Sequence, residues 1–247
     1  MPPTILITRP EPGGSRFIAT LRALPGGDLP VILSPVLQIR PEGALPDLEG
    51  VRWLIFTSQN GVFRFVELSA RRDIPAYAVG DATAQAAEAA GMHAISCAGD
   101  ARDLLARITA DCEAGRAAGP MLHLRGSHAA ADVAGALRAA GIMASDAVLY
   151  SQAHMPLNDA AHACLAGKDP VIVPVFSPRS AEALAADASI KAPLVVLAIS
   201  QAAADRIPQG AARAFVVAER PDAAAMLRAW PRALAEAYRL EGTRRAQ

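Results

Sequence analysis

The sequence predicts an α/β protein with two similar units, each a parallel sheet covered by helices. Three observations support this class. Short β-branched runs alternate with alanine-rich segments whose apolar residues recur every three or four positions, which is typical of strands and helices in a parallel sheet. The segments resemble one another in pairs, in the same order. The length of 247 residues also exceeds the usual size of one hydrophobic core.

Three paired segments follow one another in both sets. "WLIFTSQNGVFRFVEL" resembles "VIVPVFSPRSAEALAA", since each has a strand, a phenylalanine, a hydroxyl residue, a turn and a helix. "AYAVGDATAQAAEAAG" and "AISCAGDARDLLARI" are matched by "PLVVLAISQAAADRIPQG" and "AFVVAERPDAAAMLRAW". The resemblance is weak in identity but consistent in order, which indicates an internal repeat.

The fourth pair predicts that the N-terminus belongs with the second set. "MLHLRGSHAAADVAGALRAAG" closes the first set, and its counterpart "ILITRPEPGGSRFIATLRAL" begins at Ile5. The predicted divisions are 42–146 for an inserted α/β domain, 1–35 plus 155–247 for a discontinuous α/β domain, and 36–41 and 147–154 for two linker strands. Paired side by side, the linker strands would form a hinge, so relative domain motion is expected. The final "LEGTRRAQ" has no apolar periodicity and is expected to be a frayed tail.

Composition and charge exclude several classes. The 24 Lys and Arg residues balance 24 Asp and Glu residues, and scattered arginines form no basic stripe of the kind that tracks nucleic acid. Cys97, Cys112 and Cys164 lie far apart without zinc or redox spacing, and the five histidines are dispersed. No dinucleotide-binding or Walker-type glycine pattern occurs. No export signal or membrane-length apolar run is found, so a cytoplasmic protein is expected and a periplasmic-type binding protein is disfavoured.

Polar residues and glycines follow several predicted strands, at the edge where an open parallel sheet binds ligands. "TSQNG" is one such loop, in which Thr57 and Ser58 offer hydroxyls and Gly61 lets the backbone approach a ligand. Helix N-termini there hold carboxylates or phosphates without lysines. The alternative is that these residues only cap helices. Two domains with such loops predict a cleft for a large, multiply acidic small molecule. His123 alternates with leucines in "MLHLRG" and is expected to be structural.

Seven segments occur in an order that resembles one known family. They are "ILITRPEP", "IFTSQNGV", "AVGDATAQAAEAAG", "LHLRGSH", "VLYSQ", "VFSPRSAEAL" and "VVLAISQAAADRI". Each motif is short, but their order and spacing together are fairly specific and extend from Ile5 to about Leu227. On these residues the chain resembles the uroporphyrinogen-III synthases.

The resemblance implies a fold and a reaction. Family members have two similar α/β domains joined by a two-stranded linker, which agrees with the repeats. They close hydroxymethylbilane, a linear tetrapyrrole with eight carboxylates, into uroporphyrinogen III, with loss of water and inversion of ring D through a spirocyclic intermediate. No cofactor or metal is used in the family. The chain is thus expected to be a cofactor-independent, cyclising hydro-lyase of porphyrin and heme biosynthesis.

The resemblance also implies site residues. Hydroxyl-rich and glycine loops of the family match residues at the predicted strand ends, and arginines that end two related strands could pair with carboxylates. The expected substrate-binding residues are Arg9, Thr57, Ser58, Asn60, Gly61, Gly80, Thr83, Arg125, Gly126, Ser177, Pro178, Arg179 and Ser200. Tyr150 matches a linker tyrosine. Its phenol, with an ordinary pKa of about 10, could act as general acid toward the departing hydroxyl, or could merely pack the hinge.

The sequence departs from the family pattern in one loop of the discontinuous domain. Many members have a glycine followed by a threonine, where this chain has Ser200 and Ala203 in "AISQAAA". The alternative to a synthase is therefore a non-catalytic tetrapyrrole- or anion-binding module. The expected partners are the substrate and, transiently, the hydroxymethylbilane synthase that supplies it. Nucleic acid and membrane are not expected as partners, and the protein is expected to be a monomer.

Overall fold

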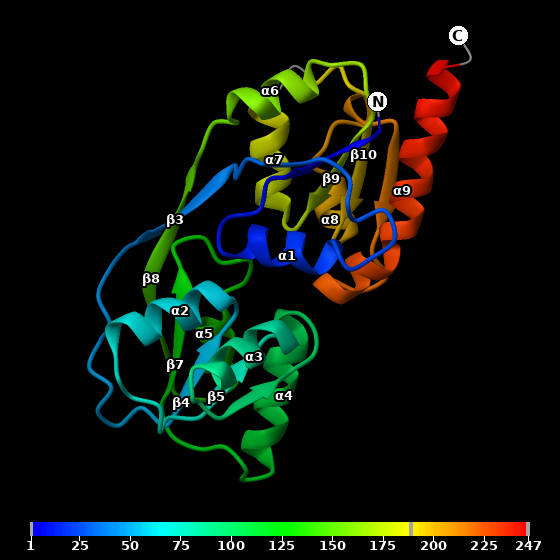
Figure 1. Cartoon of the computed structure of the whole chain (residues 1–247). Helices are drawn as coiled ribbons and strands as arrows, with labels where there is room; N and C mark the ends of the chain where they lie inside the picture. The colour runs from blue at the N-terminus through cyan, green and yellow to red at the C-terminus, as the bar shows by residue number, and fades with distance from the viewer. Residues whose placement is uncertain (1, 188–189, 246–247) are drawn as a thin grey trace. The chain divides into compact units, whose positions relative to one another are not determined.

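The computed structural model describes residues 2–187 and 190–245, which divide into two compact units. Unit 1 is made from both ends of the chain, up to Gln38 and from Ala153 onward, and unit 2 is Ile39–Gln152. Figure 1 shows unit 1 in blue at one end of the chain and in yellow to red at the other. The domain limits expected from the sequence, with an inserted domain at 42–146, stay a prediction.

Unit 1 contains a five-stranded sheet in the order β11-β10-β9-β1-β2. Its strands are β1 (Thr4–Ile7), β2 (Val31–Leu33), β9 (Val171–Val175), β10 (Leu194–Ala198) and β11 (Ala214–Val217). All neighbours are parallel, with Ile5 of β1 opposite both Val31 and Ile172. Every residue of β9 and β10 is buried, as expected of strands covered on both faces.

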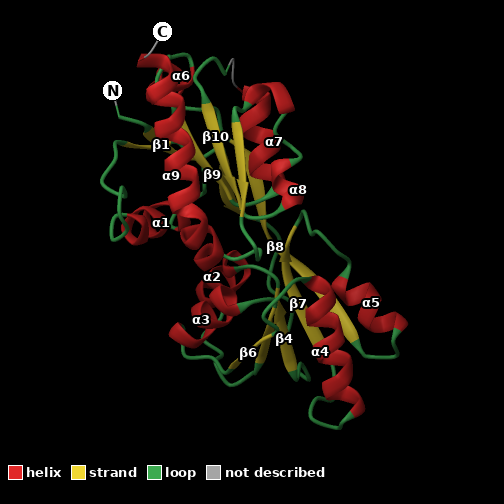
Figure 2. Cartoon of the chain, turned by 90° about the vertical axis from the view of Figure 1, so that its right-hand side faces the viewer, coloured by secondary structure: helices red, strands yellow, loops and turns green. Residues whose placement is uncertain are grey.

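Helices cover both faces of this sheet because successive strand residues point to opposite sides. Leu6 and Val173 pack with α6, α7 and α8, whereas Ile7 and Ile172 pack with α1 and α9 (Figure 2). The helices are α1 (Gly13–Leu21), α6 (Asp159–Leu165), α7 (Pro178–Asp187), α8 (Gln201–Ala204) and α9 (Ala223–Arg245), with a short 3₁₀ turn, η1 (Gln209–Ala211). The predicted α/β class is confirmed here.

Unit 2 contains a six-stranded sheet in the order β3-β8-β7-β4-β5-β6. Its strands are β3 (Leu37–Pro41), β4 (Trp53–Phe56), β5 (Ala76–Ala78), β6 (Ala94–Ser96), β7 (Met121–Gly126) and β8 (Ala144–His154). The neighbours from β8 to β6 are parallel. Phe56 and Leu122 pack with α2 and α3, whereas Ile55 and Met121 pack with α4 and α5. These helices are α2 (Gln59–Leu68), α3 (Asp81–Ala89), α4 (Ala101–Glu113) and α5 (Val133–Ala139).

The two stretches predicted to be extended, β3 and β8, lie side by side. The Met155 N–H donates to the Val36 carbonyl at 2.9 Å, and the Glu42 N–H donates to the Leu149 carbonyl at 3.1 Å. From Val36 to Glu42 the residue numbers increase, while those of their partners decrease from Met155 to Leu149. The two strands are therefore antiparallel. Each strand passes from one unit into the other along the chain.

The two sheets have the same strand order once the repeats are aligned. The segments β9, β10, β11 and β1 of unit 1 match β4, β5, β6 and β7 of unit 2, and β2 then takes the place of β8. The register supports the same alignment: Ile172 lies opposite Ile5, and their equivalents in unit 2, Trp53 and Met121, also lie opposite each other. The internal repeat predicted from weak sequence similarity is therefore a repeat of topology.

The prediction that the C-terminal segment LEGTRRAQ forms a frayed tail was wrong for residues 240–245. Residues expected to fray continue α9, because Leu240 packs on the unit 1 core and Glu241 is only 6% exposed. Ala246 and Gln247 lie outside the described residues. In the described ranges, none of the helices is both long and apolar enough to span a bilayer.

Candidate functional site

Each sheet has a switch point, where the strand order reverses, and open parallel sheets bind ligands outside such points. In unit 2 the chain proceeds outward from β4 through β5 to β6 and then returns to β7, so the reversal lies between β4 and β7. In unit 1 the equivalent position lies between β9 and β1. The predicted residues at these four strand ends are Thr57, Ser58, Asn60, Gly61, Arg125, Gly126, Ser177, Pro178, Arg179 and Arg9. Most of the predicted site therefore falls at the two switch points.

At the unit 2 switch point, Thr57 contacts a buried histidine. Thr57 Oγ1 lies 3.1 Å from His123 Nε2, and His123 is 1% exposed. Burial, together with the positive charge of Arg125, lowers the pKa of His123 to about 4, although Asp146 and Asp132 act in the opposite direction. The imidazole is therefore neutral near pH 7, with one nitrogen donating and one accepting. Its hydrogen bond fixes the direction of the Thr57 hydroxyl.

Ser58 and Tyr150 meet at the same edge of the sheet. Ser58 is the N-cap of α2, and its Oγ accepts from the Asn60 N–H at 3.2 Å. Tyr150, on β8, is 5% exposed, and its ring lies against Gly126, where a Cβ would come within 3.2 Å of the phenol oxygen. Burial raises the pKa of Tyr150, and hydrogen bonding with Ser58 and with the Gly126 backbone partly offsets the rise. The predicted general acid is thus a buried, protonated phenol between two predicted site residues.

Glycines at this edge allow close approach. A Cβ on Gly61 would lie 2.8 Å from the Leu124 carbonyl oxygen, so only glycine lets α2 start this close to β7.

Gly80 is the N-cap residue of α3, and its carbonyl accepts from the Thr83 N–H at 3.0 Å. Thr83 is 5% exposed, so its side chain points into unit 2. Gly80 and Thr83 follow β5, one strand away from the switch point.

Arg125 is already engaged by a carboxylate. Its Nε and Nη2 both lie 2.7 Å from Asp146 Oδ2, and Nη1 donates to the Gly126 carbonyl at 3.0 Å. About a quarter of each charged side chain is exposed. This ion pair neutralises the arginine and holds it along the sheet edge, so any contact with a substrate carboxylate would compete with Asp146.

Arg9, the equivalent arginine of unit 1, has a different environment. Its guanidinium lies over the ring of Phe176, with 4.5 Å from Cζ to the ring centroid, and Phe176 meets Phe17 edge to face. Burial, with the positive charge of Arg16, lowers the pKa of Arg9, which still stays protonated. Among the side chains that the structure describes, no carboxylate lies within salt-bridge distance of Arg9. A partly desolvated cation at a switch point is suited to bind an anion.

The other unit 1 residues begin helices. Ser177 Oγ accepts from the Ser180 N–H at 3.1 Å at the start of α7, followed by Pro178, which suits the first helical position. Arg179 lies in the first turn of α7 and is partly exposed. Ser200, the departure from the family pattern, caps α8 by accepting from the Ala203 N–H at 3.3 Å. These hydroxyls cap helices, as the alternative interpretation proposed, while the capped N-termini remain at the edge where ligands bind.

Sequence reasoning missed three contributors. His123 was expected to be structural, yet it holds the Thr57 hydroxyl. Asp146, which pairs with Arg125, was expected only as the last residue of the inserted domain. Phe176 lies in a quoted segment and was given no role, whereas its ring supports Arg9. Aligning the two repeats residue by residue would have drawn attention to all three, because each lies at or opposite a switch-point residue.

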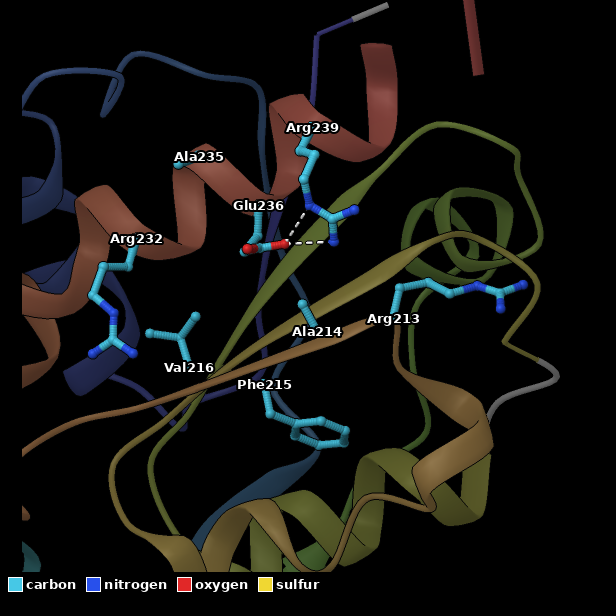
Figure 3. Close-up of a pocket in the computed structure, with 8 residues that line it drawn as sticks. All are labelled: Arg213, Ala214, Phe215, Val216, Arg232, Ala235, Glu236 and Arg239. Atoms are coloured by element: carbon cyan, nitrogen blue, oxygen red, sulfur yellow. Dashed lines mark hydrogen bonds and ion pairs between the residues drawn. The ribbon is translucent and has the colours of Figure 1, made fainter. Parts of the chain in front are cut away.

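One pocket of about 440 Å³ lies elsewhere, on unit 1 between α9 and the edge strand β11 (Figure 3). Its lining residues are Arg213, Ala214, Phe215, Val216, Arg232, Ala235, Glu236 and Arg239. Figure 3 shows the α9 side chains on one wall, with Glu236 and Arg239 hydrogen-bonded to each other. None of these residues belongs to the predicted site, and the pocket is remote from the switch point in sequence and topology.

Comparison with known proteins identifies the family. The family model described as uroporphyrinogen-III synthase HemD matches residues 19–228. A uroporphyrinogen-III synthetase structure from Helicobacter pylori superimposes with a TM-score of 0.63 at 17% identity, covering 94% of this chain and 99% of that one. A mutant uroporphyrinogen III synthase from the extremely thermophilic bacterium Thermus thermophilus gives a TM-score of 0.53 at 16% identity, covering 95% and 99%. No curated protein matches the chain in sequence.

The two sheets share the order of five parallel strands, to which unit 2 adds the antiparallel β3, and polar residues lie at both switch points; together these define a two-unit α/β protein with candidate ligand sites at strand ends. The family match spans more than half of the chain. The chain therefore belongs to the uroporphyrinogen-III synthase family, whose members are enzymes of tetrapyrrole biosynthesis.

Proposed function

We propose that the protein converts hydroxymethylbilane into uroporphyrinogen III, acting as a cyclising hydro-lyase that inverts ring D. The observation that carries the proposal is the buried phenol of Tyr150 beside the switch point of unit 2. The chain belongs to the uroporphyrinogen-III synthase family, which gives the proposed product. A neutral phenol is a suitable acid, because burial keeps its pKa above the ordinary value and its proton in place at neutral pH.

The first chemical step is loss of water. The electron pair of the pyrrole that carries the hydroxymethyl group expels the hydroxyl, which takes a proton from Tyr150 and leaves as water, so that a cationic azafulvene and an ionised phenol remain. The azafulvene carbon bonds to the substituted position of ring D and gives the spirocyclic intermediate. That intermediate fragments and closes again with ring D turned over, and the ring carbon that forms the last bond loses a proton to restore aromaticity.

Positioning supplies most of the rate and all of the isomer selectivity in this proposal. The bilane cyclises unaided to isomer I, so the protein must hold it in the geometry that leads to the spirocyclic route. Positioning can contribute roughly 7 to 11 kcal/mol at best. In unit 2, N–H groups at the start of α2 could hold a substrate carboxylate, and in unit 1 the start of α7 and Arg9 offer the same kind of contact.

We also propose that the protein acts in the cytoplasm as a monomer, without a cofactor, on substrate released by hydroxymethylbilane synthase. Balanced charge and the scattered arginines support a small-molecule substrate over a polyanionic polymer.

A coupled assay tests the proposed function. Porphobilinogen is supplied to hydroxymethylbilane synthase with and without the protein, and the oxidised products are separated into isomers I and III. A shift from isomer I to isomer III is expected. Unchanged isomer I, from protein with a cooperative unfolding transition, would contradict catalysis. Tight binding of the bilane in the same sample would then support the alternative, a non-catalytic tetrapyrrole-binding module.

A further inference from the structure

We propose that the free edge of β11, together with the arginines of α9, binds an extended acidic segment of a partner protein by strand addition. The binding place is the pocket of about 440 Å³ between α9 and β11 that Figure 3 shows, called the β11 groove below. The proposal goes beyond the proposed function, because the groove uses residues outside both switch points.

The first step concerns the edge of the sheet. In the order β11-β10-β9-β1-β2, β11 has β10 on one side, and among the described residues no strand lies on its other side. Its pairing with β10 runs from Ala214 to Val217. One row of its backbone N–H and C=O groups therefore serves β10, while the other row faces outward. Extended peptides bind to other sheets by pairing with such a row.

The second step concerns charge. Arg239 is paired with Glu236, and its Nη2 lies 2.7 Å from Oε2. Arg213 and Arg232 are exposed, and in the described ranges no carboxylate lies within salt-bridge distance of either one. Figure 3 shows Arg232 and Arg239 on the α9 wall and Arg213 just before β11. The groove thus offers two uncompensated cations, which complement an acidic ligand.

The spacing of the groove residues suits an extended chain. Arg232 and Arg239 lie two helical turns apart on α9, about 10 Å along its axis. A strand covers this length in about three residues, and its alternate side chains point to the same side, about 7 Å apart. Carboxylates at alternate positions would therefore reach the flexible arginines. Ala214 and Ala235 line the groove between them, and their small side chains leave room for a backbone.

Other ligands fit these features less well. A small carboxylate would use the cations but not the outward row of backbone groups. Single-stranded nucleic acid binds where aromatic rings stack on its bases, and Phe215, the aromatic residue of the lining, packs on the core of unit 1 instead. A second copy of this chain, paired edge to edge, would bring the same arginines against each other, and this repulsion opposes association. An acidic peptide uses both the cations and the edge.

Fluorescence anisotropy with synthetic peptides tests the proposal. The probe is a labelled peptide of about eight residues that alternates glutamate and valine, which is the length of an ordinary strand. We expect saturable binding with a Kd below about 100 μM at low salt, and no binding of a peptide that alternates lysine and valine. If the acidic peptide does not bind at about 1 mM, the arginines only protect the edge from aggregation, and the proposal is overturned.

Substitutions test the role of the charges. Arg213→Gln combined with Arg232→Gln should weaken binding of the acidic peptide about tenfold while leaving the yield of isomer III unchanged. The matched control is Arg71→Gln combined with Arg206→Gln, which removes the same charge from two exposed arginines outside the groove. Equal weakening by the two double variants would reduce the effect to net charge and refute the groove. Because binding is measured directly, failure of the proposed function would not affect this result.

The strand addition itself has two tests. In two N-methylated probes, either the odd or the even residues lose their N–H, so one probe lacks the donors that face β11. That probe should bind at least about tenfold more weakly than the other. The unmodified probe should slow hydrogen exchange in residues 214–217 and not in β2, the other edge strand of the sheet.

Three outcomes would contradict strand addition by an acidic peptide. Equal binding of the two methylated probes, or protection of β2 instead of β11, would show that the edge of β11 is not used. Complete displacement of the probe by citrate at equal concentration would assign the groove to small carboxylates. Tighter binding of single-stranded RNA than of the acidic peptide would assign it to nucleic acid.

Discussion

The two switch points have the same backbone plan and different chemistry. Aligned by strand register and helix N-caps, Thr57 of unit 2 corresponds to Phe176 of unit 1, and Ser58 corresponds to Ser177. Unit 2 carries the hydrogen-bonded pair of Thr57 and His123 and, against Gly126, the buried phenol of Tyr150. Unit 1 carries an arginine stacked on an aromatic ring.

The arginines sharpen this difference. Arg125 and Arg9 occupy equivalent positions at the ends of β7 and β1, yet Arg125 is neutralised by Asp146 and Arg9 stacks on Phe176. Similarly, His123 is replaced in unit 1 by Ile7, which lies in the hydrophobic core. The duplicated fold therefore supplies two equivalent places for ligands. We expect the side chains at these places to differ in role, with proton donation in unit 2 and anion binding in unit 1.

The largest expected effect concerns the stability of unit 2. The pKa of His123 in the folded protein, about 4, lies below the ordinary value of 6.5, so the unfolded chain binds this proton first as pH falls. The free energy of unfolding should be constant above about pH 6.5 and decrease by up to roughly 3 kcal/mol toward pH 4. Urea unfolding at a series of pH values measures this decrease.

The matched variant gives unit 2 the apolar arrangement of unit 1. In the double variant Thr57→Val, His123→Leu, the free energy of unfolding should be nearly independent of pH between 6.5 and 4, because no histidine remains to be protonated at that position. An unchanged pH dependence in the double variant would assign the acid sensitivity to other groups.

The next effect is on turnover. Tyr150→Phe keeps the ring that packs on Gly126 but removes the acid, so kcat for isomer III should fall roughly 100-fold. The exposed Tyr238 on α9 provides the matched control, since Tyr238→Phe makes the same change far from the switch points. Equal kcat values for the two variants would show that Tyr150 is not the general acid. They would also contradict the proposed difference in role between the two units.

A smaller effect is expected on binding at unit 1. Arg9→Gln removes a partly buried cation that has no carboxylate partner among the described residues, so KM should rise roughly tenfold with kcat nearly unchanged. Arg206→Gln, which removes an exposed arginine paired with Glu182, controls for the change in net charge. If the two variants have the same KM, Arg9 does not bind the substrate.

The smallest effect is expected at the equivalent arginine. Arg125→Gln should raise KM no more than about threefold, because Asp146 already neutralises the cation and the pair is partly exposed. Asp146→Asn should release Arg125 and lower KM slightly. An effect of Arg125→Gln as large as that of Arg9→Gln would remove the distinction between the two units.

Sequence alone predicted the fold well because periodicity and internal similarity are properties of whole segments. The α/β class followed from the repeated order of strand and helix segments, whereas the assignment of the N-terminus to the second set, made from "ILITRP" matching "MLHLRG", stays a prediction. The end of α9 was predicted wrongly, because its last turns are stabilised by packing of Leu240 on a distant core and not by local periodicity.

The site was harder to predict because its chemistry depends on which side chains meet across strands. Tyr150 and Gly126 were visible in the sequence, but their contact depends on a register shift between Arg125 and Gly126. The contrast between Arg9 and Arg125 depends on Asp146 lying beside only one of them. Neither the register shift nor the carboxylate has a signal in local composition.

The pairing of β1 with β9 has a consequence for how the chain is made. Thr4 lies opposite Val171, so β1 leaves the ribosome about 167 residues before one of its two partners. At ordinary rates of synthesis this wait lasts roughly 10 to 30 s, during which all of unit 2 emerges. During that time the apolar residues of β1 must avoid non-native contacts. A ribosome that stops before β9 would release unit 2 with an N-terminal arm that still exposes its apolar face.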